Sequence, residues 1–219
     1  MNLKMETPIV RLSDLDSQTV YEPSEDSFLL LDSLEADLNS FANLKPNICL
    51  EIGSGSGVII TALAMAFKRN NWPGLFIAVD INPDACRVTK NTSIINSTSV
   101  DIVRMDLVSS LKANHLFDIL IFNPPYVVTD SSEIFDERLI SKTWAGGRDG
   151  REVMDRLFPL VPTLLSSQGI FYLIVIKENK PSDIIGIFQG LGMRGGVAAE
   201  RKVRGEHLYV LRFVKNSKQ

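Results

Sequence analysis

The sequence predicts an α/β protein whose mostly parallel sheet is covered by helices on both faces. Short apolar runs at 47–52, 75–80 and 117–122 alternate with segments of helical spacing, which is the order that builds parallel β-α-β units. The runs are mostly apolar and do not alternate with polar residues, as expected of strands buried on both faces. With 219 residues, of which 45% are hydrophobic, the chain can close one large core. We therefore expect a single domain over residues 1–219.

The first predicted helix begins at Ser24. This serine can cap the helix, and the acids Glu25 and Asp26 suit the positive end of its dipole. Apolar residues then recur at helical spacing, at Phe28, Leu31, Leu34 and Leu38. We expect these apolar residues to face the core.

Four buried strands are predicted in the first part of the chain, at Asn47–Ile52, Leu75–Asp80, Val100–Met105 and Phe117–Phe122. Helices are predicted between them at Val58–Arg69 and at Asn82–Ile95, the second opened by an asparagine cap and a proline. The fourth strand ends at a double proline because proline cannot donate to a sheet ladder. The remaining predictions are a loop at 127–150, helices at Glu152–Leu165 and Ser182–Leu191, and strands at Ile170–Lys177 and His207–Val214.

Composition argues against several classes of protein. The net charge is −3 with both signs interspersed, which gives no basic stripe for nucleic-acid phosphates. No apolar run is long enough for a membrane span, so we expect a soluble protein of the cytoplasm, with the nucleus left open. Cys49 and Cys86 are expected to be reduced core residues. His115 and His207 lack partners at ligand spacing, so no metal is predicted.

A glycine-rich turn follows the first strand. Gly53, Gly55 and Gly57 are evenly spaced, and such glycines permit a sharp turn and close approach of a ligand to the backbone. A dinucleotide fingerprint would place its third glycine at position 58, where Val58 stands. The turn therefore indicates a nucleoside-type cofactor and disfavours NAD.

Acids end three of the predicted strands. Asp80 can accept hydrogen bonds from both ribose hydroxyls of NAD or of S-adenosylmethionine, although a solvated acid at a strand end is the alternative. Glu51 could face a cationic group or a bound water, or be a solvent-facing strand end. Asp106 and Leu107 could contact an adenine ring, but by themselves they are typical of an ordinary turn.

The tetrapeptide Asn123-Pro124-Pro125-Tyr126 directly follows the fourth strand. The Asn123 side-chain oxygen and the Pro124 carbonyl could accept both N–H bonds of a planar NH2 group, which raises the charge density on a poorly nucleophilic nitrogen. Pro125 restricts this backbone further, and Tyr126 could stack on the flat face of the substrate. The alternative is a strand-ending turn with a buried tyrosine.

The chain resembles the HemK-like glutamine methyltransferases of class I translation release factors, in their eukaryotic and archaeal type with the NPPY motif. The matching segments are Val20–Glu35, Cys49–Val58, Asp80–Ala85, Phe122–Val128, Trp144–Pro162 and Phe171–Asn179. The resemblance implies the class I methyltransferase (Rossmann-like) fold, with seven strands and an antiparallel last pair. It also implies S-adenosylmethionine as cofactor, with S-adenosylhomocysteine as product, and N5-methylation of the glutamine in a Gly-Gly-Gln motif.

The resemblance also implies roles for particular residues. Those expected to hold the cofactor are Ser27, Glu51, Gly53, Gly55, Asp80, Asp106, Leu107 and Asn123. The family often has threonine at the position of Ser27, and the hydroxyl is kept. The substrate amide is expected on Asn123 with its Pro-Pro-Tyr. The glycine-rich loop Trp144–Gly150 is expected to be flexible and to close over the substrate.

Two protein partners are implied: the class I release factor as substrate, and a small zinc-binding activator subunit that covers an apolar edge of the sheet. The candidate edge is Val100–Val103. Three alternatives stay open: an N6-adenine methyltransferase acting on DNA or RNA, a protein lysine methyltransferase, and a scaffold that has lost turnover.

Overall fold

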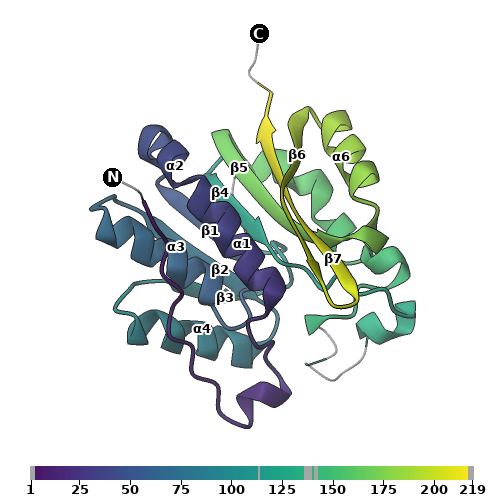
Figure 1. The fold of residues 1–219 in the computed structure, drawn as a ribbon, viewed down its shortest axis with the longest axis horizontal. Coiled ribbons are helices and arrows are strands. Elements are labelled where there is room, and N and C mark those ends of the chain that lie inside the picture. Colours follow the sequence, from purple (N-terminus) through teal and green to yellow (C-terminus); the bar gives the residue numbers. More distant parts are fainter. Residues whose placement is uncertain (1–2, 113, 136–139, 141–142, 217–219) are drawn as a thin grey trace.

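A computed structural model describes residues 3–112, 114–135, 140 and 143–216. It contains one seven-stranded sheet in the order β3-β2-β1-β4-β5-β7-β6 (Figure 1). The strands are β1 (Ile48–Ile52), β2 (Leu75–Asp80), β3 (Asp101–Arg104), β4 (Phe117–Phe122), β5 (Leu165–Ile176), β6 (Met193–Val203) and β7 (Glu206–Lys215). The α-helices are α1 (Glu25–Ala36), α2 (Leu38–Leu44), α3 (Val58–Arg69), α4 (Pro83–Ile95), α5 (Val161–Leu164) and α6 (Pro181–Gly190).

The sheet is mostly parallel, as predicted. Strands β3, β2, β1, β4 and β5 pair in parallel, whereas β7 runs antiparallel to both β5 and β6. This confirms the seven-stranded class I methyltransferase fold with an antiparallel last pair. The carboxyl ends of β1, β2 and β4 meet at one edge of the sheet, where open α/β sheets bind their ligands.

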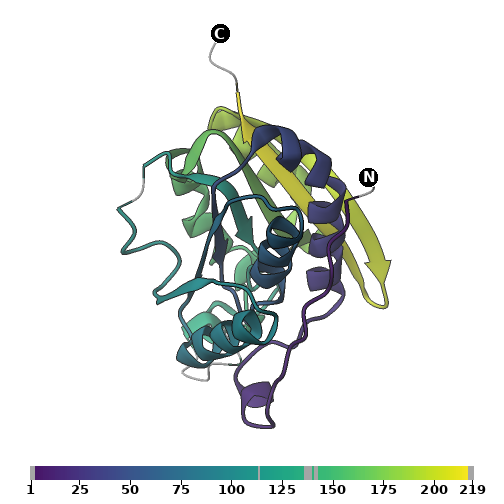
Figure 2. The ribbon, with the colours of Figure 1, turned by 90° about the vertical axis from the view of Figure 1, so that its left-hand side faces the viewer.

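Helices cover both faces of the sheet, which Figure 2 shows from the side. Phe171 on β5 packs against Phe188 of α6, with ring centroids 5.5 Å apart. The next residue, Tyr172, donates its hydroxyl to Asp37 at the junction of α1 and α2. Because successive strand residues point to opposite faces, α6 and α1 lie on opposite sides. Helix α3 contacts both α1 and α4, so these three form one layer.

The first helix is joined to the last hairpin. Helix α1 contacts both β6 and β7, and Arg201 on β6 pairs with Glu25 at 2.7 Å and with Asp32 at 2.5 Å. Glu25 therefore lies at the surface, where its ion pair connects α1 to the edge strand β6.

The predicted helix at Glu152–Leu165 is wrong. The chain instead makes 3-10 turns at Met154–Arg156 and Phe158–Leu160 before the four-residue α5. Pro159 and Pro162 lack the N–H that an α-helical ladder needs in its interior. The strand that follows starts earlier than predicted, at Leu165 instead of Ile170.

Strand β6 has no counterpart among the predicted elements, and the resemblance alone implied a seventh strand. Its sequence, MRGGVAAERKV, is rich in glycine, alanine and charge, and most of its residues are exposed or half-buried. Glycine and charge are tolerated there because β6 is an edge strand. Its composition therefore carries little strand signal.

The predicted helix caps and the predicted burial of the two cysteines are each confirmed only in part. Asn82 caps α4, its Oδ1 accepting from the Asp84 amide at 2.9 Å, as predicted. Ser24 stands at the cap of α1 without a side-chain cap bond, so that prediction is wrong. Both cysteines are free; Cys49 is fully buried, but Cys86 is partly exposed and not a core residue.

Within the ranges that the structure describes, none of the helices combines the length and apolar character needed to cross a membrane.

Candidate active site

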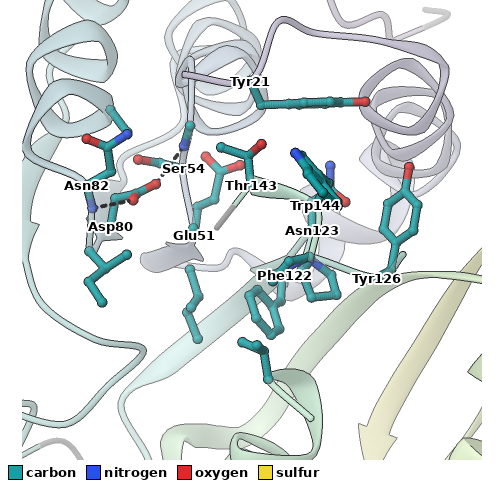
Figure 3. A pocket seen from close by; sticks show the side chains of 18 of the residues that line it. Tyr21, Glu51, Ser54, Asp80, Asn82, Phe122, Asn123, Tyr126, Thr143 and Trp144 are labelled. Atoms are coloured by element: carbon teal, nitrogen blue, oxygen red, sulfur yellow. Dashed lines mark hydrogen bonds between the residues drawn. The ribbon is translucent and has the colours of Figure 1, made fainter. Parts of the chain in front are cut away.

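A pocket of about 620 Å³ opens at the carboxyl edge of the sheet. Residues from the ends of β1, β2, β3 and β4 line it, together with the segment that leads into α1 and the segment 143–145. Figure 3 shows Asp80, Glu51 and Ser54 toward one end of the pocket and Asn123 and Tyr126 toward the other. The strand-end acids and the tetrapeptide therefore lie toward opposite ends of one pocket.

The glycine-rich turn owes its spacing to backbone geometry. Gly53, Gly55 and Gly57 have φ values of 67°, 52° and 75°, in the left-handed region that favours glycine. A Cβ at Gly57 would lie 2.8 Å from the backbone of Thr89, whereas one at Gly55 would meet no atom within 4 Å. Gly57 thus permits close packing of α3 on α4, and Gly55 leaves space for a ligand beside the turn.

Asp80 holds this turn in place. Its Oδ2 accepts from the Gly55 amide at 2.9 Å and its Oδ1 from the Asn82 amide at 2.8 Å. The side chain is 9% exposed, so the alternative of a solvated acid is wrong. Burial raises the pKa of Asp80, and the backbone bonds oppose that shift. Each carboxylate oxygen can accept a second bond, which suits the two hydroxyls of a ribose.

Glu51 is buried beneath the pocket, with 1% of its surface exposed. Its Oε2 accepts from the Ile60 amide at 3.0 Å. Burial raises the pKa of Glu51 well above its ordinary value, because an ionised carboxylate loses solvation there. A cation placed in the pocket would favour the ionised form of the Glu51 carboxyl group. The sulfonium and ammonium groups of S-adenosylmethionine fit this requirement.

Asp106 and Leu107 line the pocket beyond β3, and their contact with an adenine ring stays a prediction. Leu107 has a left-handed φ of 49°. Asp106 pairs through Oδ2 with Arg156 at 2.5 Å, a residue to which the sequence analysis gave no role. One carboxylate oxygen of Asp106 therefore stays available for an exocyclic amine.

Asn123 presents a free acceptor. Its Nδ2 donates to Asp26 at 3.0 Å, whereas its Oδ1 is buried and has no hydrogen-bond partner among the described residues. A buried acceptor without a partner is costly in a folded protein. Asn123 also lines the pocket, so an N–H donor of a ligand would satisfy this acceptor.

Tyr126 is fixed in the pocket wall from two sides. Its hydroxyl donates to Asp26 at 3.2 Å, and its carbonyl accepts from Asn179 Nδ2 at 2.8 Å. Pro124 and Pro125 line the pocket between Asn123 and Tyr126. Stacking of Tyr126 on a substrate stays a prediction.

Asp26 and Tyr21 are the functional residues that sequence reasoning missed. Asp26 is 3% exposed, whereas the sequence suggested for it only a favourable interaction with the helix dipole. Helical spacing could have indicated its burial. Asp26 precedes Leu30 and Leu34 by four and eight residues, and all three lie on the buried side of α1. Phe28, predicted to face the core, is 36% exposed.

Ser27 and Tyr21 meet the other oxygen of Asp26. The Ser27 amide donates to Oδ1 at 2.6 Å, its hydroxyl donates at 3.2 Å, and the Tyr21 hydroxyl donates at 3.2 Å. Ser27 lines the pocket, and its contact with the cofactor stays a prediction. Figure 3 shows the Tyr21 ring across the top of the pocket.

The glycine-rich loop Trp144–Gly150 packs against the tetrapeptide, and its closure over a substrate stays a prediction. Val127 forms a parallel bridge with Ala145, and a Cβ at Gly150 would lie 2.0 Å from the Tyr126 carbonyl oxygen. Asn179 also donates to the Asp149 carbonyl at 2.8 Å. These glycines permit close approach to the tetrapeptide. Residues 136–139 and 141–142 of the predicted loop lie outside the described residues.

The fold and this pocket define a class I methyltransferase that uses S-adenosylmethionine. A family model for the "Methyltransferase small domain" matches residues 24–145. The chain belongs to the HemK-like protein-glutamine methyltransferases, in their eukaryotic and archaeal branch.

Two relatives and one solved structure support this family. The chain is 47% identical over 199 residues to "Methyltransferase HEMK2" of Homo sapiens, covering 90% of each. It is 35% identical over 221 residues to the "eRF1 methyltransferase catalytic subunit mtq2" of Schizosaccharomyces pombe, covering 95% of each. The E. cuniculi Mtq2-Trm112 complex that methylates the eRF1 termination factor matches with a TM-score of 0.66 and 28% identity, over 90% of this chain and 99% of that one.

Proposed function

We propose that this protein transfers a methyl group from S-adenosylmethionine to the side-chain amide nitrogen of the Gly-Gly-Gln glutamine in a class I release factor. The observation that carries the proposal is the buried, unpartnered Oδ1 of Asn123 at the substrate end of the pocket. The names of the relatives, which include an eRF1 methyltransferase and a protein N5-glutamine methyltransferase, support the choice of substrate.

The residues of the pocket have separate tasks in this reaction. Bound S-adenosylmethionine supplies a methyl group attached to a positively charged sulfur. Asp80 holds the ribose, and Glu51 balances the positive charge. Asn123 Oδ1 and the Pro124 carbonyl accept the two N–H bonds of the glutamine amide and aim its nitrogen at the methyl carbon. The cofactor would supply the methyl group to this nitrogen and leave as S-adenosylhomocysteine, and the nitrogen would lose one proton to solvent.

Preorganised acceptors are effective because they need no rearrangement as charge develops on the nitrogen. A planar NH2 group offers two N–H bonds in one plane, and two acceptors suit it. An ammonium group of lysine offers a tetrahedral set of donors and carries charge before reaction. The amide therefore fits this site better than an amine does.

A nucleic-acid substrate fits the charge of the pocket poorly. Among the described residues, its charged lining consists of the acids Asp26, Glu51, Asp80, Asp106 and Glu206 and one arginine, Arg156. Phosphate binding requires basic groups, so we expect no direct contact with nucleic acid.

We also propose a small activator subunit as partner, bound along β3. This strand lies at one edge of the sheet, and Val103 on it is 42% exposed. An edge strand with apolar side chains invites pairing with another chain. The E. cuniculi relative was solved as a complex of Mtq2 with Trm112. We expect the partner to bind zinc, which chelation during purification tests. We expect the pair to act in the cytoplasm, with the nucleus left open, which fluorescent tagging tests.

The experiment that tests the function is transfer of labelled methyl from S-adenosylmethionine to a eukaryotic-type release factor. Labelling is expected on the wild-type factor and not on a factor whose Gly-Gly-Gln glutamine is replaced by alanine. In the enzyme, Asn123→Ala should lower kcat at least about a hundredfold, as loss of one preorganised group does. Cofactor affinity, measured by calorimetry, should change little.

Labelling of the alanine variant of the factor would place the methyl group on another residue and contradict the proposal. Transfer to oligonucleotides, with none to the factor, would instead favour the N6-adenine alternative.

A further inference from the structure

The acid at the start of α1 is surrounded by donors. Oδ2 of Asp26 accepts from Asn123 Nδ2 at 3.0 Å and from the Tyr126 hydroxyl at 3.2 Å. Oδ1 accepts from the Tyr21 hydroxyl at 3.2 Å and from the amide and hydroxyl of Ser27. A carboxylate that only accepts hydrogen bonds matches this environment.

Both tyrosines keep their protons at neutral pH and therefore remain donors. Burial, together with the nearby charge of Asp26, raises the pKa of Tyr21 and that of Tyr126 well above the ordinary value. Neither hydroxyl competes with Asp26 as an acceptor for Asn123.

This arrangement determines which end of the Asn123 side chain faces the substrate. An amide group has a donor end and an acceptor end that are nearly equal in shape. With a carboxylate on one side, Nδ2 is the end that faces Asp26, and Oδ1 is left without a hydrogen-bond partner among the described residues. Asn123 itself lines the pocket. In the reverse orientation, oxygen would face oxygen at Asp26, and an NH2 group would meet the NH2 group of the substrate.

We propose that Asp26 is a positioning residue for methyl transfer, whose carboxylate fixes the Asn123 amide with Oδ1 directed at the substrate nitrogen. This inference rests on the role of Asn123 in the proposed function. It also gives the segment that leads into α1 a part in catalysis, through a contact that joins residues 97 positions apart in sequence.

Two substitutions separate the chemistry of Asp26 from its volume. Asp26→Asn keeps the shape of the side chain but introduces an NH2 group among donors. Asp26→Glu adds one methylene but keeps two acceptor oxygens. If Asp26 positions Asn123, D26N should lower kcat by about ten- to a hundredfold, as misplacement of a reacting group does, and D26E should retain more activity than D26N.

Glu25→Gln is the matched control, because it removes the same charge from the same turn of α1. Glu25 pairs with Arg201 on the surface and lies outside the pocket lining. We expect kcat of E25Q to stay within about twofold of wild type. Cofactor affinity, measured by calorimetry, should be the same in E25Q as in wild type.

A second measurement does not depend on activity. In the NMR spectrum, the side-chain NH2 signal of Asn123, assigned by its loss in N123D, should be shifted downfield and exchange slowly with solvent in wild type and in E25Q. In D26N it should lose both properties. An inactive wild-type enzyme would overturn the proposed function, whereas this signal would still decide the role of Asp26.

Two results would overturn the inference. One is a D26N enzyme with wild-type kcat, or with kcat above that of D26E, since Asp26 would then act by filling space. The other is an unchanged Asn123 signal in D26N.

Discussion

At the scale of the residue, Glu51 shows how a binding site can work against stability. In the part of the chain that the structure describes, the carboxyl group has one backbone donor and no basic side chain paired with it. Burial raises its pKa, so the folded protein holds this proton at pH values where the unfolded chain has lost it. Stability therefore falls as pH rises from the unfolded pKa of Glu51 through its folded pKa.

Glu51→Gln should raise the stability of the cofactor-free protein and weaken its binding of the cofactor. The cofactor-free variant should melt at a higher temperature than wild type at neutral pH, and this difference should shrink as pH falls toward the unfolded pKa. S-adenosylmethionine should bind about 10- to 100-fold more weakly, which corresponds to loss of a hydrogen bond to a charged group of roughly 1.5–3 kcal/mol. Thermal denaturation and calorimetry across a pH series measure the two. If the variant had the melting temperature and the cofactor affinity of wild type, Glu51 would not face the positive charge of the cofactor.

Residue-scale prediction from sequence succeeded where a residue ends a strand. Asp80 is the last residue of β2 and Asn123 directly follows β4, so the fold class alone places both at the binding edge. Their contacts with ligands stay predictions. Asp26 and Tyr21 could not be found in this way. Their role depends on contacts with the tetrapeptide, which a single sequence does not display.

At the scale of the element, the strands divide by environment. Strands β1, β2 and β4 lie inside the sheet and are apolar except for one acid each, and their predicted ranges differ from the observed ones by one residue at most. Strand β6 is an edge whose outer side meets solvent, so its sequence needs no apolar pattern. The segment 152–165 has apolar residues at helical spacing, but its two prolines prevent a continuous helix.

The segment 144–150 permits a test of close packing. Gly150 has a φ of 66°, and a Cβ there would collide with the Tyr126 carbonyl. Gly150→Ala should lower stability by at least about 1–3 kcal/mol from backbone strain alone, and activity should fall because Tyr126 must move.

Gly190, at the end of α6, is the control, since a Cβ there would meet no atom within 4 Å. Gly190→Ala should leave the denaturant midpoint nearly unchanged. Equal denaturant midpoints for the two variants would mean that segment 144–150 does not depend on close packing against the tetrapeptide.

At the scale of the whole molecule, the sheet has two edges of different character. Strand β3 ends the sheet beside β2, and β6 ends it beside β7. Both edges carry an exposed valine, Val103 on β3 and Val197 on β6, with 42% and 49% of their surfaces exposed. The two positions form a matched pair for a test of the partner surface.

Val103→Glu should prevent formation of the complex with the activator subunit, because a charge would be buried against its apolar surface. Val197→Glu should form the complex as wild type does. Co-expression followed by size-exclusion chromatography reports both results. Loss of the complex in the β6 variant, with retention in the β3 variant, would move the partner surface to the opposite edge.

The pairing of Arg201 with Glu25 and Asp32 also has a consequence during protein synthesis. Helix α1 leaves the ribosome early, but the hairpin against which it packs is made more than 160 residues later. Until β6 has emerged, α1 lacks that packing surface, and Asp26 at its start is held less firmly beside the tetrapeptide. We therefore expect nascent chains that stop before β6 to bind cofactor and substrate poorly, so that methylating activity appears late in translation.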